Sequence, residues 1–389
     1  MEGVDCDVIV VGAGTAGCYL AQQLARRGLD VRVVEQNRHT KADSGVVSNR
    51  FFEYVPDRSL IKARIKAMDL IGPSGAKVNI RSTKPFAFLL DRERLGKKMR
   101  ERVRSRVVSA RFLGFVAHRG WLDVRAQEAD SHRETSYSCR VLVGADGAMS
   151  AVRTALGIRP PNLTWGVMAR LDRPFSKGRC VAVHFDKQYS PDGFSWTIPQ
   201  NSELGLLSSV KPMDCFQRFA HAVSGGENDA EGNVWKGHRA DLHSHVVGAP
   251  IPVGTCRTHA DRTILVGDAA GQTKPLTGGG IVWGLRCADI AARAVEYAFD
   301  AGRYDAFFWK TEYERRWQAA IGRELRRQLA VRKLYARLGN AQIDGIFNAI
   351  KPQLERASEF DYDALSGLIA RLPKISLARV LAPALLRLA

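Results

Sequence analysis

Apolar runs that end in glycine-rich loops recur three times along the chain. Residues 7–11 (DVIVV) lead into GAGTAG, residues 138–143 (SCRVLV) into GADG, and residues 264–266 (ILV) into GDAAGQTKPLTGGG. A short, continuous apolar run between turn signals predicts a buried strand. Because a stretch of helical character follows each loop, the pattern predicts repeated strand–loop–helix units and an α/β fold.

The third of these segments carries the longest loop. Gly278, Gly279 and Gly280 stand just before an apolar helical stretch that begins at Ile281. Glycine lets backbone N–H groups approach a ligand closely, and the positive end of the following helix favours an electron-rich or anionic group. Asp268, at the strand end, is suited to hydrogen-bond a ribose or ribityl hydroxyl. A glycine-rich surface turn is the alternative, but the flanking apolar strand and helix favour a ligand loop.

The first segment has the spacing of a dinucleotide-binding turn. Gly12, Gly14 and Gly17 form GxGxxG between the strand and a predicted helix. A second predicted strand, residues 31–34, ends at Glu35. This distance from the motif is close to the ~20 residues that place a carboxylate on a ribose hydroxyl. A turn that binds nothing is the alternative, but strand, helix, second strand and acid in this order favour a bound dinucleotide.

The middle of the chain predicts antiparallel strands and one basic helix. Residues 63–80 alternate and turn at GPSG, which predicts a hairpin of a second, sheet-based domain. Residues 107–117 and 121–126 predict a further antiparallel pair. Residues 91–106 predict a basic amphipathic helix. Its apolar face carries Leu95, Met99 and Val103.

Arg92 and Asp146 each have a structural and a ligand-binding interpretation. Arg92 begins the basic helix and either holds a phosphate or is one of many solvated charges. Asp146 lies in the GADG loop and either caps a short helix predicted over residues 151–156 or faces the pyrophosphate of a cofactor. The local pattern leaves both interpretations open.

A predicted strand over residues 194–199 (FSWTIP) carries large apolar side chains at every second position. Phe194, Trp196 and Ile198 therefore share one face, and residues 205–210 are the expected partner strand. Such a stripe is most often part of a core, and a pocket wall is the alternative.

These elements divide the chain into three predicted regions. They are a discontinuous nucleotide-binding domain (1–60, 81–158 and 256–300, with a hairpin insertion near 61–80), a sheet-based substrate-binding domain (159–255) and a basic helical C-terminal region (301–389).

Charge narrows the possible partners. The 389 residues carry a formal net charge of +18, which favours a phospholipid surface, a nucleic acid or a phosphorylated ligand. The basic residues form no recognisable nucleic-acid-binding module, so no nucleic-acid partner is expected. The basic, apolar tail over residues 372–389 either lies at a lipid interface or docks on the protein body, and Pro383 disfavours one long helix there.

The sequence predicts no metal site, no disulfide framework and no membrane span. Its seven cysteines lie far apart and form no CxxC pair. No run of about 18 apolar residues appears, and the N-terminus shows no signal peptide. A cytoplasmic protein is expected.

Together the three glycine motifs resemble a known fold. GxGxxG with Glu35, then GADGAMSAVR, then GDAAGQTKPLTGGGI are similar to the glutathione-reductase-type FAD fold shared with aromatic hydroxylases. Within that fold the chain resembles the geranylgeranyl reductase family, because Gly271 follows GDAA where hydroxylases carry His, and FSWTIP is similar to that family's pocket motif. The resemblance implies FAD as the cofactor, in a Rossmann domain beside an antiparallel-sheet domain with a helical C-terminal region.

The resemblance also implies roles for individual residues. Those expected at FAD are Gly12, Gly14 and Gly17 with Ala16 at the pyrophosphate, Glu35 at the adenosine ribose, Gly45 and Arg92 over the cofactor, Asp268 at the ribityl chain or phosphate, and Gly280 and Ile281 at the isoalloxazine. Phe194 and Trp196 are expected to line a prenyl pocket. No side chain is identified as the proton donor.

Two departures keep an alternative function open. Ile198 stands where the family usually has Phe, so FSWTIP also resembles the WxWxIP motif of flavin-dependent halogenases. Ser44 precedes Gly45 where relatives often carry Cys. An FAD-dependent monooxygenase or halogenase acting on an apolar substrate is therefore the alternative.

The archaeal branch of the reductase family fits best. Its members saturate the geranylgeranyl chains of ether phospholipids. The resemblance then implies a geranylgeranylated phospholipid substrate and an electron donor, which is NAD(P)H, a ferredoxin or a deazaflavin. It also implies a peripheral position on the anionic inner face of the cell membrane, with which the basic composition agrees.

Overall fold

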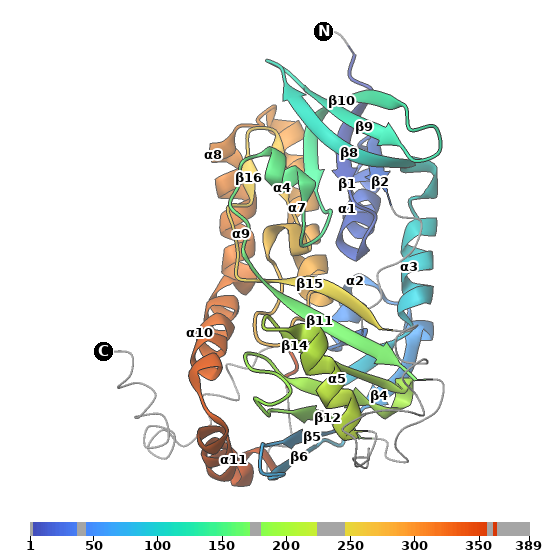
Figure 1. The fold of residues 1–389 in the computed structure, drawn as a ribbon. Coiled ribbons are helices and arrows are strands. Elements are labelled where there is room, and N and C mark those ends of the chain that lie inside the picture. The colour runs from blue at the N-terminus through green and yellow to red at the C-terminus, as the bar shows by residue number, and fades with distance from the viewer. Residues whose placement is uncertain (1–2, 37–43, 172–179, 224–245, 356–360, 364–389) are drawn as a thin grey trace, which may run out of the picture.

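The computed structural model describes residues 3–36, 44–171, 180–223, 246–355 and 361–363. The tail predicted over residues 372–389 lies outside this part of the chain. Figure 1 shows two sheet-containing regions stacked along the long axis, with the C-terminal helices along one side of both.

The first region is built on a mixed seven-stranded sheet. Its strands are β1 (Cys6–Val11), β2 (Val31–Glu35), β8 (Val107–Ala117), β9 (Leu122–Glu128), β10 (Glu134–Gly144), β16 (His259–Ala260) and β17 (Thr263–Leu265). β1 pairs in parallel with β2 and β10, and β17 pairs in parallel with β10. The long strands β8 and β10 extend beyond this parallel part and pair with β9 antiparallel. The predicted buried strands and antiparallel pair are confirmed.

Helices cover both faces of this sheet, which explains why its strands are continuously apolar. The helices are α1 (Thr15–Arg26), α2 (Phe51–Tyr54), α3 (Arg92–Glu101), α4 (Ala151–Ala155) and α7 (Ile281–Ala301). Successive strand side chains point to opposite faces. Val8 and Val10 pack in the core with α1 and α7, whereas Ile9 and Val11 pack in the core on the α4 side.

The second region is another seven-stranded sheet. Its order is β15 (Val247–Val253), β11 (Asn162–Arg170), β14 (Glu203–Ser208), β13 (Ser195–Ile198), β12 (Val181–His184), β5 (Ala67–Ile71) and β6 (Lys77–Arg81). β13 and β14 pair antiparallel, as predicted. Helix α5 (Pro212–Val223) buries Phe216 and Phe219 against one face of this sheet. The other face borders the space between the two regions.

The predicted hairpin over residues 63–80 is confirmed only in part. β5 and β6 pair antiparallel and lie in the second sheet. Residues 63–65 instead belong to β4 (Ile61–Ile65), which joins β3 (Val46–Val47) and β7 (Ala87–Leu90) in a three-stranded sheet. The alternation runs through Lys66 without a turn residue, so the pattern cannot show where the chain changes sheets. The predicted domain boundaries stay a prediction.

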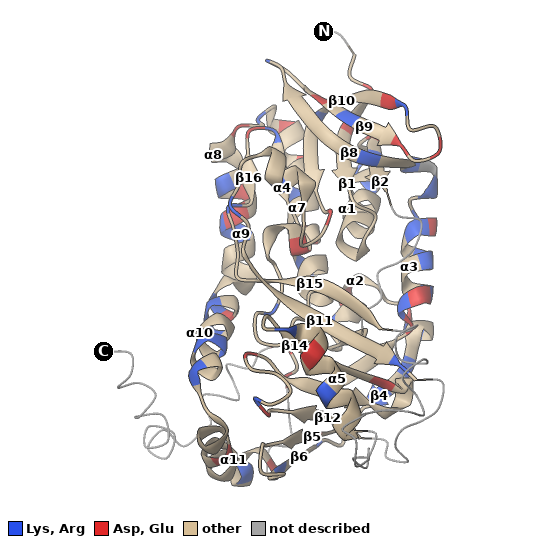
Figure 2. Cartoon of the chain, in the orientation of Figure 1, with Lys and Arg blue, Asp and Glu red and all other residues tan. Residues whose placement is uncertain are grey.

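The C-terminal helices form a nearly continuous rod. They are α8 (Ala306–Trp309), the π-helical turn η5 (Lys310–Glu314), α9 (Arg315–Trp317), the π-helical turn η6 (Gln318–Gly322), α10 (Arg323–Arg337) and α11 (Asn340–Glu355). Short 3₁₀ turns lie elsewhere at η1 (Arg58–Leu60), η2 (Arg104–Arg106), η3 (Pro199–Asn201) and η4 (Gly267–Ala270). Figure 2 shows Lys and Arg along α3 and α10. In the described part of the chain, no helix is long and apolar enough to cross a membrane.

Glu314 fastens this rod to the first sheet. Its Oε2 accepts hydrogen bonds from Thr258 N (3.1 Å) and Thr258 Oγ1 (2.9 Å) and lies 2.9 Å from His259 Nδ1. Burial is the largest single influence and raises the pKa of Glu314, but the bonds from His259 and Thr258 together outweigh it and hold the pKa at about 2. The folded protein therefore stabilises the ionised form of Glu314 relative to its protonated form.

We predict that Glu314→Gln lowers the free energy of unfolding at neutral pH by up to about 3 kcal/mol, since one pKa unit corresponds to about 1.4 kcal/mol. The folded-state pKa of about 2 lies below the ordinary value of 4.5. The contribution is therefore complete above pH ~4.5 and is lost as the pH falls toward ~2. Urea unfolding across this pH range measures it, with Glu296→Gln, half of a surface ion pair with Arg27, as the control. A deficit that does not shrink in acid contradicts the assignment.

Candidate functional site

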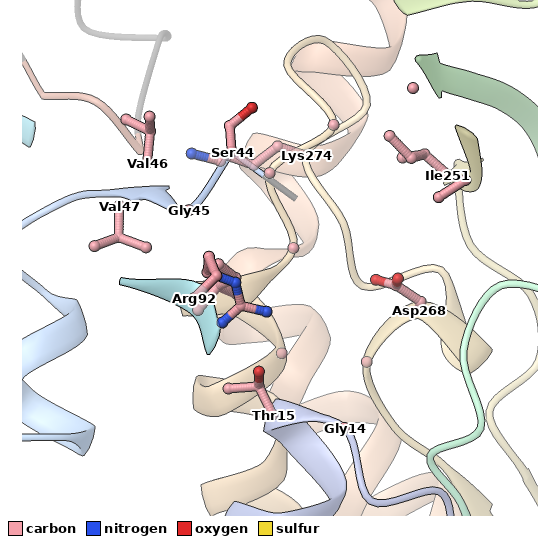
Figure 3. Close-up of a pocket in the computed structure, with 18 of the residues that line it drawn as sticks. Gly14, Thr15, Ser44, Gly45, Val46, Val47, Arg92, Ile251, Asp268 and Lys274 are labelled. Carbon is pink, nitrogen blue, oxygen red and sulfur yellow. The ribbon is translucent and has the colours of Figure 1, made fainter. Parts of the chain in front are cut away.

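A cavity of about 1000 Å³ lies between the two regions and is lined by both. Figure 3 shows its walls, with Arg92 and Asp268 on either side of the open space in this view. The cavity brings together the sequence-predicted residues Gly12, Gly14, Ala16, Glu35, Gly45, Arg92, Phe194, Trp196, Asp268, Gly280 and Ile281. Gly17 is not among the described residues that line it.

The glycines of the first motif divide into two kinds. A Cβ on Gly12 would lie 2.4 Å from the carbonyl oxygen of Ala145, and one on Gly17 would lie 2.0 Å from that of Gly12. Gly12 also has a positive φ of +104°. These two glycines therefore allow backbone segments to pack against each other. A Cβ on Gly14 would meet nothing within 4 Å, so Gly14 keeps space in the cavity free.

The end of β2 and the start of α1 meet at the cavity. Glu35 Oε2 accepts a hydrogen bond of 2.6 Å from the backbone N–H of Ala13. Within the part of the chain that the structure describes, no side chain caps α1, whose N-cap residue is Gly14. The positive end of the helix dipole therefore opens on the cavity, with a carboxylate beside it, as a pyrophosphate with an adjoining ribose requires.

Asp268 is held against the N-terminus of α7. Its Oδ1 accepts a hydrogen bond of 2.9 Å from Thr273 Oγ1. A Cβ on Gly280 would lie 2.8 Å from this same oxygen. Glycine at position 280 is therefore what lets the carboxylate lie beside the first turn of α7.

Gly45 and Arg92 pack on each other at the cavity wall. Gly45 has a positive φ of +69°, and a Cβ there would lie 2.5 Å from Arg92 Cγ. Because the arginine stem crosses directly over the glycine, a larger residue at position 45 would displace the guanidinium. Both residues border the cavity, and their position over the cofactor stays a prediction.

The structure confirms the capping interpretation of Asp146. Its carboxylate accepts hydrogen bonds from Ser150 Oγ (2.6 Å), Ala151 N (2.7 Å) and Val152 N (3.1 Å), at the start of α4. Burial raises the pKa of Asp146, and these bonds work in the opposite direction. Asp146 also borders the cavity, so its second interpretation stays a prediction.

Buried polar side chains that the sequence did not single out fix the loops in place. Arg153 donates to the carbonyl oxygens of Ala269 (2.9 Å) and Ala148 (2.8 Å), which ties the GADG loop to the GDAA loop. Gln272 accepts from Gly267 N (2.8 Å) and donates to Tyr313 Oη (2.9 Å). These bonds satisfy buried backbone groups that would otherwise destabilise the fold.

Lys274 is a further wall residue that the sequence did not single out. Only 4% exposed, it lies in the loop before the three glycines. Its Nζ lies 3.0 Å from Asp363 Oδ1 and 4.3 Å from the ring centre of Tyr362. Asp363 also accepts from Ser48 Oγ. The sequence contains many basic residues, and nothing in it distinguishes Lys274 from the others. It therefore gave no sign that Lys274 pairs with Asp363, 89 residues away.

The walls fit a cofactor with hydrogen-bonding groups. Thr277 lies in the glycine loop, and its hydroxyl oxygen is buried without a hydrogen-bond partner among the described residues. Buried polar groups in folded proteins almost always have a partner. The Thr277 hydroxyl, the uncapped N-terminus of α1 and the free space at Gly14 together suit a dinucleotide bound along this wall.

The second half of the cavity is apolar. It is lined by Met68, Leu70, Ile80, Val181, Val183, Phe185, Phe194, Trp196 and Ile198. Trp196 donates from Nε1 to Glu203 Oε1 (3.0 Å) and lies over Gly205, where a Cβ would be 2.4 Å from the indole ring. The aromatic stripe of the sequence thus borders a cavity and is not only part of a core.

Apolar residues also stand at the rim of the cavity. Met149, in the loop before α4, is 67% exposed, and Val247, at the start of β15, is 38% exposed. Both line the cavity as well. Exposed apolar side chains at the mouth of an apolar cavity suit the entry of an apolar ligand.

Comparison with known proteins identifies the family. The family described as FAD binding domain matches residues 5–204, which is just over half of the chain. The chain belongs to this FAD-binding family. FAD is accordingly its cofactor, and the predicted glutathione-reductase-type fold is confirmed.

Relatives of this FAD-binding protein cover its full length. It is 28% identical to digeranylgeranylglycerophospholipid reductase 2 of Methanothermobacter thermautotrophicus, over 98% of both chains. It is 27% identical to digeranylgeranylglycerophospholipid reductase of Methanothrix thermoacetophila, over 95% of this chain and 97% of that one. A crystal structure of a geranylgeranyl bacteriochlorophyll reductase-like protein from Thermoplasma acidophilum has the same fold, with a TM-score of 0.81, 18% identity and coverage of 97% and 98%.

We predict that Gly14→Val leaves the fold intact and weakens FAD binding by at least about tenfold, or about 1.4 kcal/mol. The new side chain meets no protein atom close to its Cβ and enters the space that the cofactor needs. Thermal unfolding of the FAD-free protein and FAD titration by fluorescence quenching measure the two effects. Gly17→Ala is the contrasting variant, because its Cβ meets the backbone and should lower the melting temperature. Unchanged FAD affinity in Gly14→Val contradicts the assignment.

We predict that Lys274→Met and Asp363→Leu are each destabilising by about 3–5 kcal/mol, because each leaves one buried charge unpaired. The double variant Lys274→Met/Asp363→Leu should be less destabilised than the sum of the two. Urea unfolding of the four proteins gives the coupling energy. Arg293→Met breaks the exposed Arg293–Asp289 pair and should change stability by less than about 1 kcal/mol. Strict additivity at Lys274 and Asp363 contradicts the proposed pairing.

Proposed function

We propose that this protein reduces the double bonds of geranylgeranyl chains in archaeal ether phospholipids, converting digeranylgeranylglycerophospholipid to its saturated form. The observation that carries the proposal is the single cavity in which the FAD-binding loops continue into an apolar, aromatic wall. The names of the full-length relatives support the same chemistry. An isoprenoid chain has no polar group along its length, which suits a wall of aliphatic and aromatic side chains.

The apolar side chains that line the cavity bind and orient the substrate rather than react with it. Reduced FAD, when bound, supplies the hydride, and a proton completes the addition to the alkene. Phe194 and Trp196 hold the prenyl chain against the cofactor wall, and the hydrogen bond from Trp196 to Glu203 fixes the indole plane. The apolar lining excludes water from the reacting bond. Ser44, at the position of a family Cys, leaves this chemistry without a thiol in that loop.

The basic composition supports a peripheral position on the anionic inner face of the cell membrane. Each Lys or Arg near such a surface contributes about 1 kcal/mol of attraction, and the chain carries 58 of them against 40 acids. Exposed Met149 and Val247 at the cavity rim support entry of the lipid chain from that side. The reductant is NAD(P)H, a ferredoxin or a deazaflavin.

We predict that the anaerobic, dithionite-reduced protein adds hydrogen to a geranylgeranylated glycerophospholipid. Mass spectrometry should show gains of about 2 mass units for each double bond reduced. Protein lacking FAD is the control and should leave the lipid unchanged. Unchanged lipid with FAD-loaded protein that consumes oxygen in a substrate-dependent way would overturn the proposal and favour a monooxygenase or halogenase.

We predict that Trp196→Ala lowers kcat/KM for the lipid by about tenfold, or about 1.4 kcal/mol, because the prenyl chain loses one wall. FAD content should be unchanged, since Trp196 lies in the apolar half. Trp165→Ala is the matched control, because Trp165 is 42% exposed on β11 and does not line the cavity. Equal losses in both variants would mean that the indole at position 196 has no special role.

A further inference from the structure

A second hollow, of about 720 Å³, is lined by the start of β11, the end of β15 and the α10 residues Leu329 and Lys333. It shares no lining residue with the FAD cavity among the described residues. The two lie near each other along β15, where Val253 borders the hollow and Ile251 borders the cavity. The residues expected at the FAD pyrophosphate, Gly12, Gly14 and Ala16, border the cavity and not the hollow. The hollow is therefore a different site from the one expected to hold the FAD phosphates.

Three cationic side chains line this hollow. Arg159 comes from the loop after α4, Arg257 from the loop after β15, and Lys333 from α10. No Asp or Glu is among the described residues that line it. None of the three makes a hydrogen bond or ion pair with another described residue, and all three are exposed. Three like charges gathered in a concave site without a counter-charge create a field that attracts an anion.

The same face of α10 extends this positive field. Arg326, Lys333 and Arg337 are exposed and separated by seven and four residues, which places them on one side of the helix. Glu324 is the one acid within α10. Figure 2 shows Lys and Arg along α10.

We propose that this hollow binds a phosphate ester. Two arginines and a lysine can together bind the oxygen atoms of a phosphate. Each guanidinium group can donate two parallel N–H hydrogen bonds to phosphate oxygens, and the lysine ammonium adds a positive point charge. The volume exceeds that of a bare phosphate and admits the organic group to which it is esterified. The ester is either a soluble small molecule or the headgroup of an anionic lipid.

Binding to the full-length, FAD-loaded protein tests the proposal with two probes. The first is sn-glycerol 3-phosphate, followed by isothermal titration calorimetry. The second is sedimentation with vesicles of phosphatidylglycerol in phosphatidylcholine, compared with phosphatidylcholine alone. The variant is Arg159→Gln/Arg257→Gln/Lys333→Gln. The matched control, Arg119→Gln/Arg125→Gln/Arg133→Gln, removes the same charge from exposed positions on the β8–β10 strands and loops.

The triple variant should bind at least about tenfold more weakly, because it loses the charged hydrogen-bond donors that would contact the phosphate. The control should bind as the unaltered protein does. Loss of glycerol phosphate binding would support the site and identify a soluble ester as its ligand. Loss of vesicle binding alone would support the site and identify a lipid headgroup. No binding of either probe, or equal effects in the variant and the control, would overturn the proposal.

The outcome of these binding tests does not depend on the proposed reductase activity. FAD absorbance and the melting temperature of the variant report whether it folds. If the protein leaves prenyl lipids unreduced but still binds a phosphate ester through these three residues, the site stands and the reductase proposal falls. If the protein reduces the lipid and the triple variant binds both probes normally, the reductase proposal stands and the proposed phosphate-ester site falls.

Discussion

The close packing of the backbone loops that follow β1, β10, β15 and β17 is the constraint on which the rest of the structure depends. A Cβ on Gly12 would lie 2.4 Å from the carbonyl oxygen of Ala145, and a Cβ on Gly271 would lie 2.1 Å from that of Gly254. A protein interior has no room to absorb an extra methyl group at such distances. Because the loops touch, the N-termini of α1 and α7 open on the same space, and one extended cofactor can contact both.

Hydrogen bonds from buried polar side chains hold these loops in this arrangement. Arg153 satisfies two carbonyl groups from different loops, and Gln272 links Gly267 to Tyr313 in the C-terminal rod. Each buried group left without a partner would cost about 1–3 kcal/mol. The loops are therefore held in shape by the protein itself, and little conformational freedom remains to be lost when FAD binds.

The cavity combines two environments that a single sheet could not provide. The first region presents backbone N–H groups, and the second presents the apolar face of a sheet that is antiparallel except for the parallel pairing of β12 with β5. Lys274 and Asp363 lie within the cavity wall as a buried pair. The proposed reductase depends on this continuity, because a hydride donor and an alkene must share one water-poor space. The second hollow, with its exposed cations, has the opposite character and suits a different ligand.

The sequence alone determined most of the strands and the glycine loops, because each depends on neighbours within about twenty positions. The FAD fold was predicted from the resemblance of three motifs in order along the chain. The predicted site residues other than Gly17 border the cavity, together with many residues that the sequence did not single out. Glu35 follows the GxGxxG motif at a fixed spacing, and Gly280 precedes α7 directly. The tertiary structure decided the rest. It assigned residues 61–65 to a different sheet from residues 67–71, and it paired Lys274 with Asp363. It also gathered Arg159, Arg257 and Lys333 in one hollow. Contacts between distant segments leave no periodicity in the chain, so charges that meet only after folding look like ordinary surface charges until the fold is known.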